Sequence, residues 1–149
     1  MGTAGQPVNF GTMAHDHEMY MMLADGAAEL RDSEGLVKYA PLLADLAGRD
    51  GHQLYLGIAY RALGVGRRLA GEHGEAETLL RQGLAIFKEL GTRWQIGRTL
   101  FELAELEMSR PRKKKAQARE ILAEAQDMFE DMQAVPYAER TRAALAALE

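Results

Sequence analysis

The chain contains no cysteine, and this absence excludes several kinds of site. Without a thiol it has no disulfide framework, no thiolate metal site and no cysteine nucleophile. Serine is nearly as scarce, since Ser33 and Ser109 are the only two, and no Gly-rich phosphate loop of the required form is present. Several carboxylates have basic partners four positions away on a helix face, as on ordinary solvated helices. We therefore expect a non-catalytic protein that uses no metal or other cofactor.

Excess positive charge is also absent, because the net charge at pH 7 is -4. Dedicated nucleic-acid binders usually carry a positive balance that neutralises phosphates, so no nucleic-acid partner is expected. The first Arg or Lys is Arg31, which leaves the N-terminus without the positive region of a secretory signal. No apolar run approaches membrane-spanning length either. These absences favour a cytoplasmic protein with no membrane partner.

The residues that are present indicate one all-helical domain. Of 149 residues, 47% are apolar, which is enough for a core without covalent cross-links. β-Branched residues are sparse and no alternating strand pattern appears, whereas helical periodicity dominates from Thr12 onward. Residues 1–11 are rich in glycine and contain Pro7, so they are expected to be a flexible leader or a remnant of an expression vector.

Two stretches of the chain share one apolar skeleton. Residues 75–90, "EAETLLRQGLAIFKEL", and residues 117–132, "QAREILAEAQDMFEDM", both place apolar side chains at the i, i+3, i+4, i+7 spacing of an amphipathic helix. Related stripes occur at a period of about 40 residues along the chain, a spacing typical of stacked helical repeats. The pattern predicts three helical hairpins, at about 12–50, 51–91 and 92–134, and a C-terminal helix at 135–149 that is either a capping helix or the start of a fourth repeat. Each hairpin would bury its stripe against the next.

The second hairpin resembles the tetratricopeptide repeat. Tyr60, Leu63 and Gly64 stand at that family's aromatic, Leu and small positions, and Gly71 stands at the turn. The period is longer than the family's usual length of about 34 residues. In this respect the chain is similar to the long-repeat arrays of bacterial regulator proteins. The resemblance implies an all-α fold, an α-α superhelix (solenoid) whose first helices line a concave groove.

By this resemblance the groove would bind a protein or peptide, and three arginines on one face would favour an acidic one. The predicted partner-binding residues are Met21, Met22, Asp25, Ile58, Arg61, Val65, Arg68, Arg98, Phe101 and Glu105. One alternative is a small-ligand sensor domain of a bacterial regulator, and another is a solvated helix face with no ligand. Self-association through the terminal helices is also open. In some proteins of this family, a clamp of groove side chains that includes an asparagine holds a chaperone's C-terminal carboxylate. The only asparagine here is Asn9, in the predicted leader, so this clamp is not expected.

Two charged clusters have simpler interpretations. His15 and His17 stand two residues apart, so on a regular helix they point in different directions and cannot chelate one ion. A polar helix start is therefore favoured over a metal site. The basic turn Arg110–Lys115, "RPRKKK", is favoured as a solvated loop, and whether it binds anything is left open.

Overall fold

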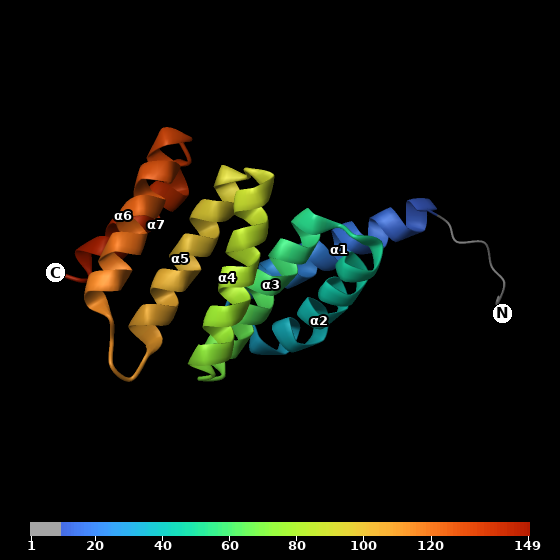
Figure 1. Cartoon of the computed structure of the whole chain (residues 1–149), viewed down its shortest axis with the longest axis horizontal. Helices are drawn as coiled ribbons and strands as arrows, with labels where there is room; N and C mark the ends of the chain where they lie inside the picture. Colours follow the sequence, from blue (N-terminus) through green and yellow to red (C-terminus); the bar gives the residue numbers. More distant parts are fainter. Residues whose placement is uncertain (1–9) are drawn as a thin grey trace.

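A computed structural model describes residues 10–149, with side chains from Asp16 onward, and all regular structure within them is helical (Figure 1). The helices are α1 (Phe10–Glu29), α2 (Ser33–Asp50), α3 (Gln53–Leu69), α4 (His73–Leu90), α5 (Arg93–Ser109), α6 (Lys115–Asp131) and α7 (Val135–Ala146). The predicted all-α class is confirmed. Helix α1 begins at Phe10, and residues 1–9 of the predicted leader lie outside the described part of the chain.

Short turns with a left-handed glycine follow α2, α3 and α4 at intervals of 20 residues, at Gly51, Gly71 and Gly91. Gly51 ends α2 with a φ of 67°, and Gly91 ends α4, 40 residues later, with a φ of 72°. A left-handed backbone costs glycine nothing because it has no Cβ, so these residues mark the predicted hairpin boundaries.

Asp32 begins α2 as an N-cap, where its carboxylate accepts a hydrogen bond from the Gly35 amide at 3.1 Å.

The helices lie in a row along the long axis of the molecule, with α1 and α2 at one end and α6 and α7 at the other (Figure 1). Each helix packs against the next one in the chain. In addition, α1 contacts α3, and α3 contacts α5. The odd-numbered helices therefore also contact one another directly, and that shared side is where the predicted groove residues fall.

One packing unit recurs in the second and third hairpins. A Cβ added to Gly57 would lie 2.6 Å from Cε1 of Phe87, and one added to Gly97 would lie 2.8 Å from Cε1 of Phe129. Both phenylalanines are fully buried, at 0% exposure. Each ring thus occupies space that only a glycine on the neighbouring helix leaves free. The apolar skeleton shared by residues 75–90 and 117–132 places Phe87 and Phe129 at matching positions, and both are core residues.

The first hairpin fills the corresponding positions the other way round. The residues 40 positions before Gly57 and Phe87 are His17 and Ala47, so the large side chain comes from α1 and the small one from α2. His17 is buried, with Nε2 lying 3.4 Å from the carbonyl oxygen of Leu46 and 3.0 Å from a carboxylate oxygen of Asp50. The first hairpin therefore departs from the packing unit of the other two.

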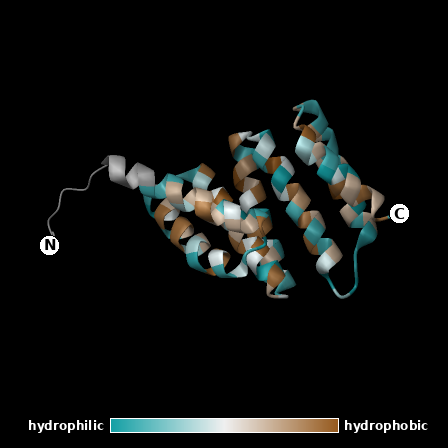
Figure 2. Ribbon diagram, turned by 180° about the vertical axis from the view of Figure 1, so that it is seen from behind, coloured by the Kyte–Doolittle hydropathy of each residue, from teal (hydrophilic) through white to brown (hydrophobic). Residues whose placement is uncertain are grey.

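Hydrophilic and hydrophobic residues are interspersed along the helices, as Figure 2 shows. Within the described residues, no helix combines the length and the apolar character needed to cross a bilayer.

Candidate functional site

Asp25 is the centre of an ion-pair network on the side shared by the odd-numbered helices. This carboxylate lies on α1 and accepts hydrogen bonds from Arg98 of α5 through both Nη1 (2.9 Å) and Nη2 (2.8 Å). It also accepts one from Nη2 of Arg61 on α3, at 3.2 Å. Two-point pairing of a guanidinium with a carboxylate is among the stronger polar contacts in proteins. Asp25 thereby connects three helices that are far apart in the sequence.

Glu29 extends the network to the C-terminal helix. It lies one turn after Asp25 on α1 and accepts a hydrogen bond from Nη2 of Arg98 at 2.8 Å. From α7 it accepts a further hydrogen bond from Nη1 of Arg140, at 3.2 Å, and one from the hydroxyl of Tyr137. Side chains of α1, α3, α5 and α7 therefore form one continuous polar cluster.

The network keeps both carboxylates ionised at neutral pH. Burial raises the pKa of Asp25, but the hydrogen bond from Arg98 and the charges of Arg61 and Arg98 outweigh it, so the pKa lies below its ordinary value. The pKa of Glu29 is also lowered, because the Tyr137 hydroxyl and Arg98 together outweigh the effect of burial. Burial and the hydrogen bond to Glu29 raise the pKa of Tyr137, so its hydroxyl remains a donor.

A second acidic centre lies further along the same helices. Glu102 of α5 is buried and accepts a hydrogen bond from Nη1 of Arg31 at 2.9 Å. Nη2 of Arg68 lies 3.9 Å from the other oxygen of Glu102, and Nη1 of Arg68 donates to the hydroxyl of Ser109 at 3.5 Å. Each of the three arginines predicted for the groove, Arg61, Arg68 and Arg98, therefore has a carboxylate partner within the chain.

Half of the predicted partner-binding residues are buried. Their exposed fractions are 2% for Ile58, 1% for Arg61, 0% for Val65, 8% for Arg98 and 3% for Phe101. The expectation of three exposed guanidinium groups on one surface is wrong, because Asp25, Glu29 and Glu102 cover them from neighbouring helices. A binding role for these five residues stays a prediction, and it would require the network to open.

The other predicted residues keep some contact with solvent. Met22 is 62% exposed, and Met21, Asp25, Arg68 and Glu105 are half-buried. They come from α1, α3 and α5, so the structure brings them to one side of the row. A role in binding stays a prediction for these residues too.

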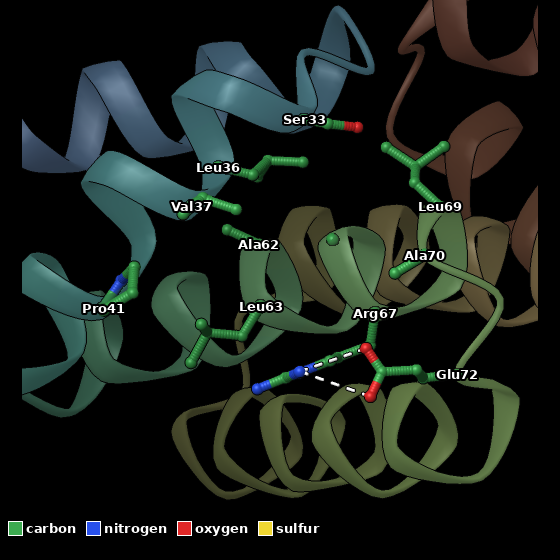
Figure 3. Close-up of a pocket in the computed structure, with 11 residues that line it drawn as sticks. Ser33, Leu36, Val37, Pro41, Ala62, Leu63, Arg67, Leu69, Ala70 and Glu72 are labelled. Carbon is green, nitrogen blue, oxygen red and sulfur yellow. Dashed lines mark hydrogen bonds and ion pairs between the residues drawn. The ribbon is translucent and has the colours of Figure 1, made fainter.

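An apolar groove lies between α2 and α3, at a place that the sequence-based site did not include. It has a volume of about 490 Å³. Its lining residues are Ser33, Leu36, Val37, Pro41, Ala62, Leu63, Gly66, Arg67, Leu69, Ala70 and Glu72. Figure 3 shows side chains of α2 and α3 facing one another across this groove. Val37 is 78% exposed, and the ion pair of Arg67 with Glu72, at 3.1 Å, lies at the edge.

The equivalent place in the next hairpin is charged. Forty residues after Val37 and Pro41 stand Glu77 and Arg81, which pair with each other at 2.9 Å. Arg110 adds further ion pairs there, to Glu77 at 2.6 Å and to Glu107 at 3.3 Å. The apolar character of the α2–α3 groove is therefore not a general property of the repeat. In the sequence, a comparison of the exposed positions of the hairpins, rather than of the buried ones, would have revealed this apolar surface.

No protein-family model matches this chain, and a search of curated proteins finds no significant match either. The resemblance to tetratricopeptide repeats therefore rests on the residues named above.

Proposed function

We propose that this chain is a non-catalytic protein-interaction module that binds a peptide or a partner helix. Its scaffold would be a tetratricopeptide-like superhelix of three hairpins closed by α7. Two observations support a repeat. The packing of Phe87 on Gly57 recurs as the packing of Phe129 on Gly97, and α3 contacts both α1 and α5. Arrays of this kind act mainly by presenting extended surfaces.

The apolar groove between α2 and α3 is the observation that carries the proposal. Its volume of about 490 Å³ lies within the roughly 300–1,000 Å³ of small-molecule pockets, so it has room for one or more apolar anchor side chains. Val37, Pro41 and Leu63 give it apolar walls, while its charged edge residues, Arg67 and Glu72, already neutralise each other. Such a groove suits apolar anchors from one face of a helix or peptide.

The sensor alternative is less well supported. A carboxylate-bearing metabolite would be recognised by free arginines, but Arg61 and Arg98 already donate to Asp25 at 2.8–3.2 Å. A ligand would have to displace that carboxylate and separate the helices it connects. For the same reason these arginines no longer favour an acidic partner.

Val37→Asp should weaken binding at least tenfold. Peptides would be selected from a random library on the immobilised chain, and their affinities measured by calorimetry. Burial of one apolar side chain contributes roughly 1.5–3 kcal/mol, and about 1.4 kcal/mol corresponds to tenfold in affinity. Because Val37 is 78% exposed in the free chain, the melting temperature should not change.

Leu42→Asp is the matched control, since Leu42 also lies on α2, is 42% exposed and does not line the groove. It should leave affinity unchanged. If the selected peptides tolerate Val37→Asp and instead lose affinity with Met22→Asp, binding uses the side of the odd-numbered helices. If no peptide is selected, the proposed function fails.

A further inference from the structure

The first helix of the row presents an apolar stripe to solvent. Met19, Leu23, Gly26 and Leu30 follow one another at intervals of four, three and four residues, which places them on one helix face. Met19 is 46% exposed, Leu23 is 38% exposed and Leu30 is 80% exposed. A Cβ added to Gly26 would meet nothing within 4 Å, so the centre of the stripe is open. We call these four residues the α1 stripe.

Inside the row, the same face is covered by the preceding hairpin. Forty residues after Met19, Leu23 and Gly26 stand Ala59, Leu63 and Gly66 of α3, and a Cβ on Gly66 would lie 3.7 Å from Cβ of Leu36 on α2. Forty residues further, Leu103 and Leu106 of α5 are 1% and 0% exposed, and α5 packs against α4. The α1 stripe therefore corresponds to the surface that α2 and α4 cover on α3 and α5, and within the described residues it is exposed.

The opposite end of the row does not offer a matching apolar face. Glu139 and Arg142 of α7 are exposed, and Arg142 pairs with Glu130 at 3.0 Å. A polar outer face is usual for a helix that caps a repeat array. Joining copies head to tail would bury these charges against the α1 stripe, at a cost that such stacking does not recover.

We propose that the α1 stripe is a dimer interface that binds the α1 stripe of a second copy, with the two helices antiparallel. A two-fold axis midway between Leu23 and Gly26 pairs Leu23 with the glycine of the other copy and Met19 with its Leu30. Leu23 then fits over the open surface at Gly26 of the other copy, and Met19 packs against Leu30 at each end of the interface. Such an interface is self-complementary and closed, so it yields a dimer and not a filament.

Charge also favours the antiparallel arrangement. The segment from Asp16 to Leu30 contains four acidic residues, of which Glu18 is the exposed one, but no Lys or Arg, and the next residue is Arg31. An antiparallel pair places Glu18 near Arg31 of the other copy, where it would join the ion pair that Arg31 already makes with Glu102 at 2.9 Å. A parallel pair would place Glu18 beside another Glu18 and leave a gap between two glycines. Like charges placed side by side destabilise such a pair. This interface does not include Val37 or Pro41, so it stands independently of the proposed function.

The first test is the mass of the full chain in solution. Sedimentation equilibrium should give twice the mass of one chain, and Leu23→Glu should raise the dimer dissociation constant by roughly 100-fold or more, because two unpaired charges would be buried together. Val135→Glu is the matched control, since Val135 is an apolar residue on α7 that is 56% exposed. It should leave the dimer intact. A monomer at all concentrations, or a dimer that tolerates Leu23→Glu, overturns the proposal.

The second test uses the absence of native cysteine. A Met19→Cys chain mixed with a Leu30→Cys chain should form a disulfide-linked heterodimer on mild oxidation, because the antiparallel pair brings these positions together. Neither chain alone should cross-link, since eleven residues of helix separate like positions by about 16 Å, well beyond the roughly 7 Å that a disulfide spans. Cross-linking of each chain with itself, without the heterodimer, would show parallel helices and overturn the arrangement.

Discussion

Asp25→Ala should lower the free energy of unfolding by about 3–5 kcal/mol, because it removes one side of a buried ion pair. Asp25 accepts three hydrogen bonds, from both terminal nitrogens of Arg98 and from Nη2 of Arg61. Arg61 is only 1% exposed, so water cannot replace the lost partner without opening the packing between α1 and α3. Guanidinium chloride unfolding, followed by the helical circular dichroism signal, measures the loss.

Asp45→Ala is the control for this substitution. Asp45 is an exposed carboxylate on α2, outside both the network and the α1 stripe, so its loss should change stability by no more than about 0.5 kcal/mol. If Asp25→Ala is equally harmless, the two guanidinium groups are solvated in the folded protein and the network does not hold the helices together. Arg61→Ala should also destabilise, so any change that it causes in partner affinity has to be corrected for unfolding.

The pH dependence of stability identifies the Asp25 carboxylate more directly. Its pKa is lower in the folded chain than in the unfolded one, so the stability it contributes is fully present above the unfolded value of about 3.9. That contribution is lost as the pH falls through the lowered, folded pKa. The wild-type advantage over Asp25→Asn should therefore be constant near neutral pH and decline only below about pH 4. An advantage that declines between pH 6 and 5 would assign it to another group.

The arrangement of helices in the second and third hairpins followed from periodicity. The predicted hairpin 51–91 corresponds to α3 and α4, which run from Gln53 to Leu90. Interior hairpins have to bury the same face against both neighbours, so their apolar stripes recur in the sequence. The first hairpin has no preceding neighbour in the described chain, and its pattern is correspondingly weaker, with His17 and Ala47 exchanging volumes.

Periodicity could not show that the arginines of the predicted site are paired with carboxylates of the same chain. A helical pattern shows which face carries Arg98, but not whether an acid from a helix 73 residues away covers it. In the sequence, Asp25 already belonged to the predicted groove face together with Arg61 and Arg98, and Glu29 follows it by one helical turn. The presence of these two acids on α1 was the available signal that the arginines could be paired within the chain. The α2–α3 groove is harder to predict, since it depends on the volume left by small residues such as Ala62 and Gly66.

Phe87→Ala should lower the free energy of unfolding by about 3–5 kcal/mol, as is usual for a fully buried aromatic ring. The cavity cannot collapse easily, because the ring faces a glycine and no side chain from that position can move into the space. Gly57→Ala should also destabilise, since its Cβ would lie 2.6 Å from Cε1 of Phe87. Denaturant unfolding of each variant gives both values, and Lys113→Ala in the exposed turn should stay within about 0.5 kcal/mol.

The double variant Gly57→Ala/Phe87→Leu tests whether the two positions share one volume. The smaller leucine leaves room for the new methyl group, so the double variant should be more stable than the sum of the separate losses from Gly57→Ala and Phe87→Leu predicts. Gly97→Ala/Phe129→Leu should behave in the same way, because Gly97 and Phe129 make the same contact at 2.8 Å. Strict additivity in both pairs would show that the rings and glycines act independently. The repeated packing unit, and with it the main support for a stacked array, would then fail.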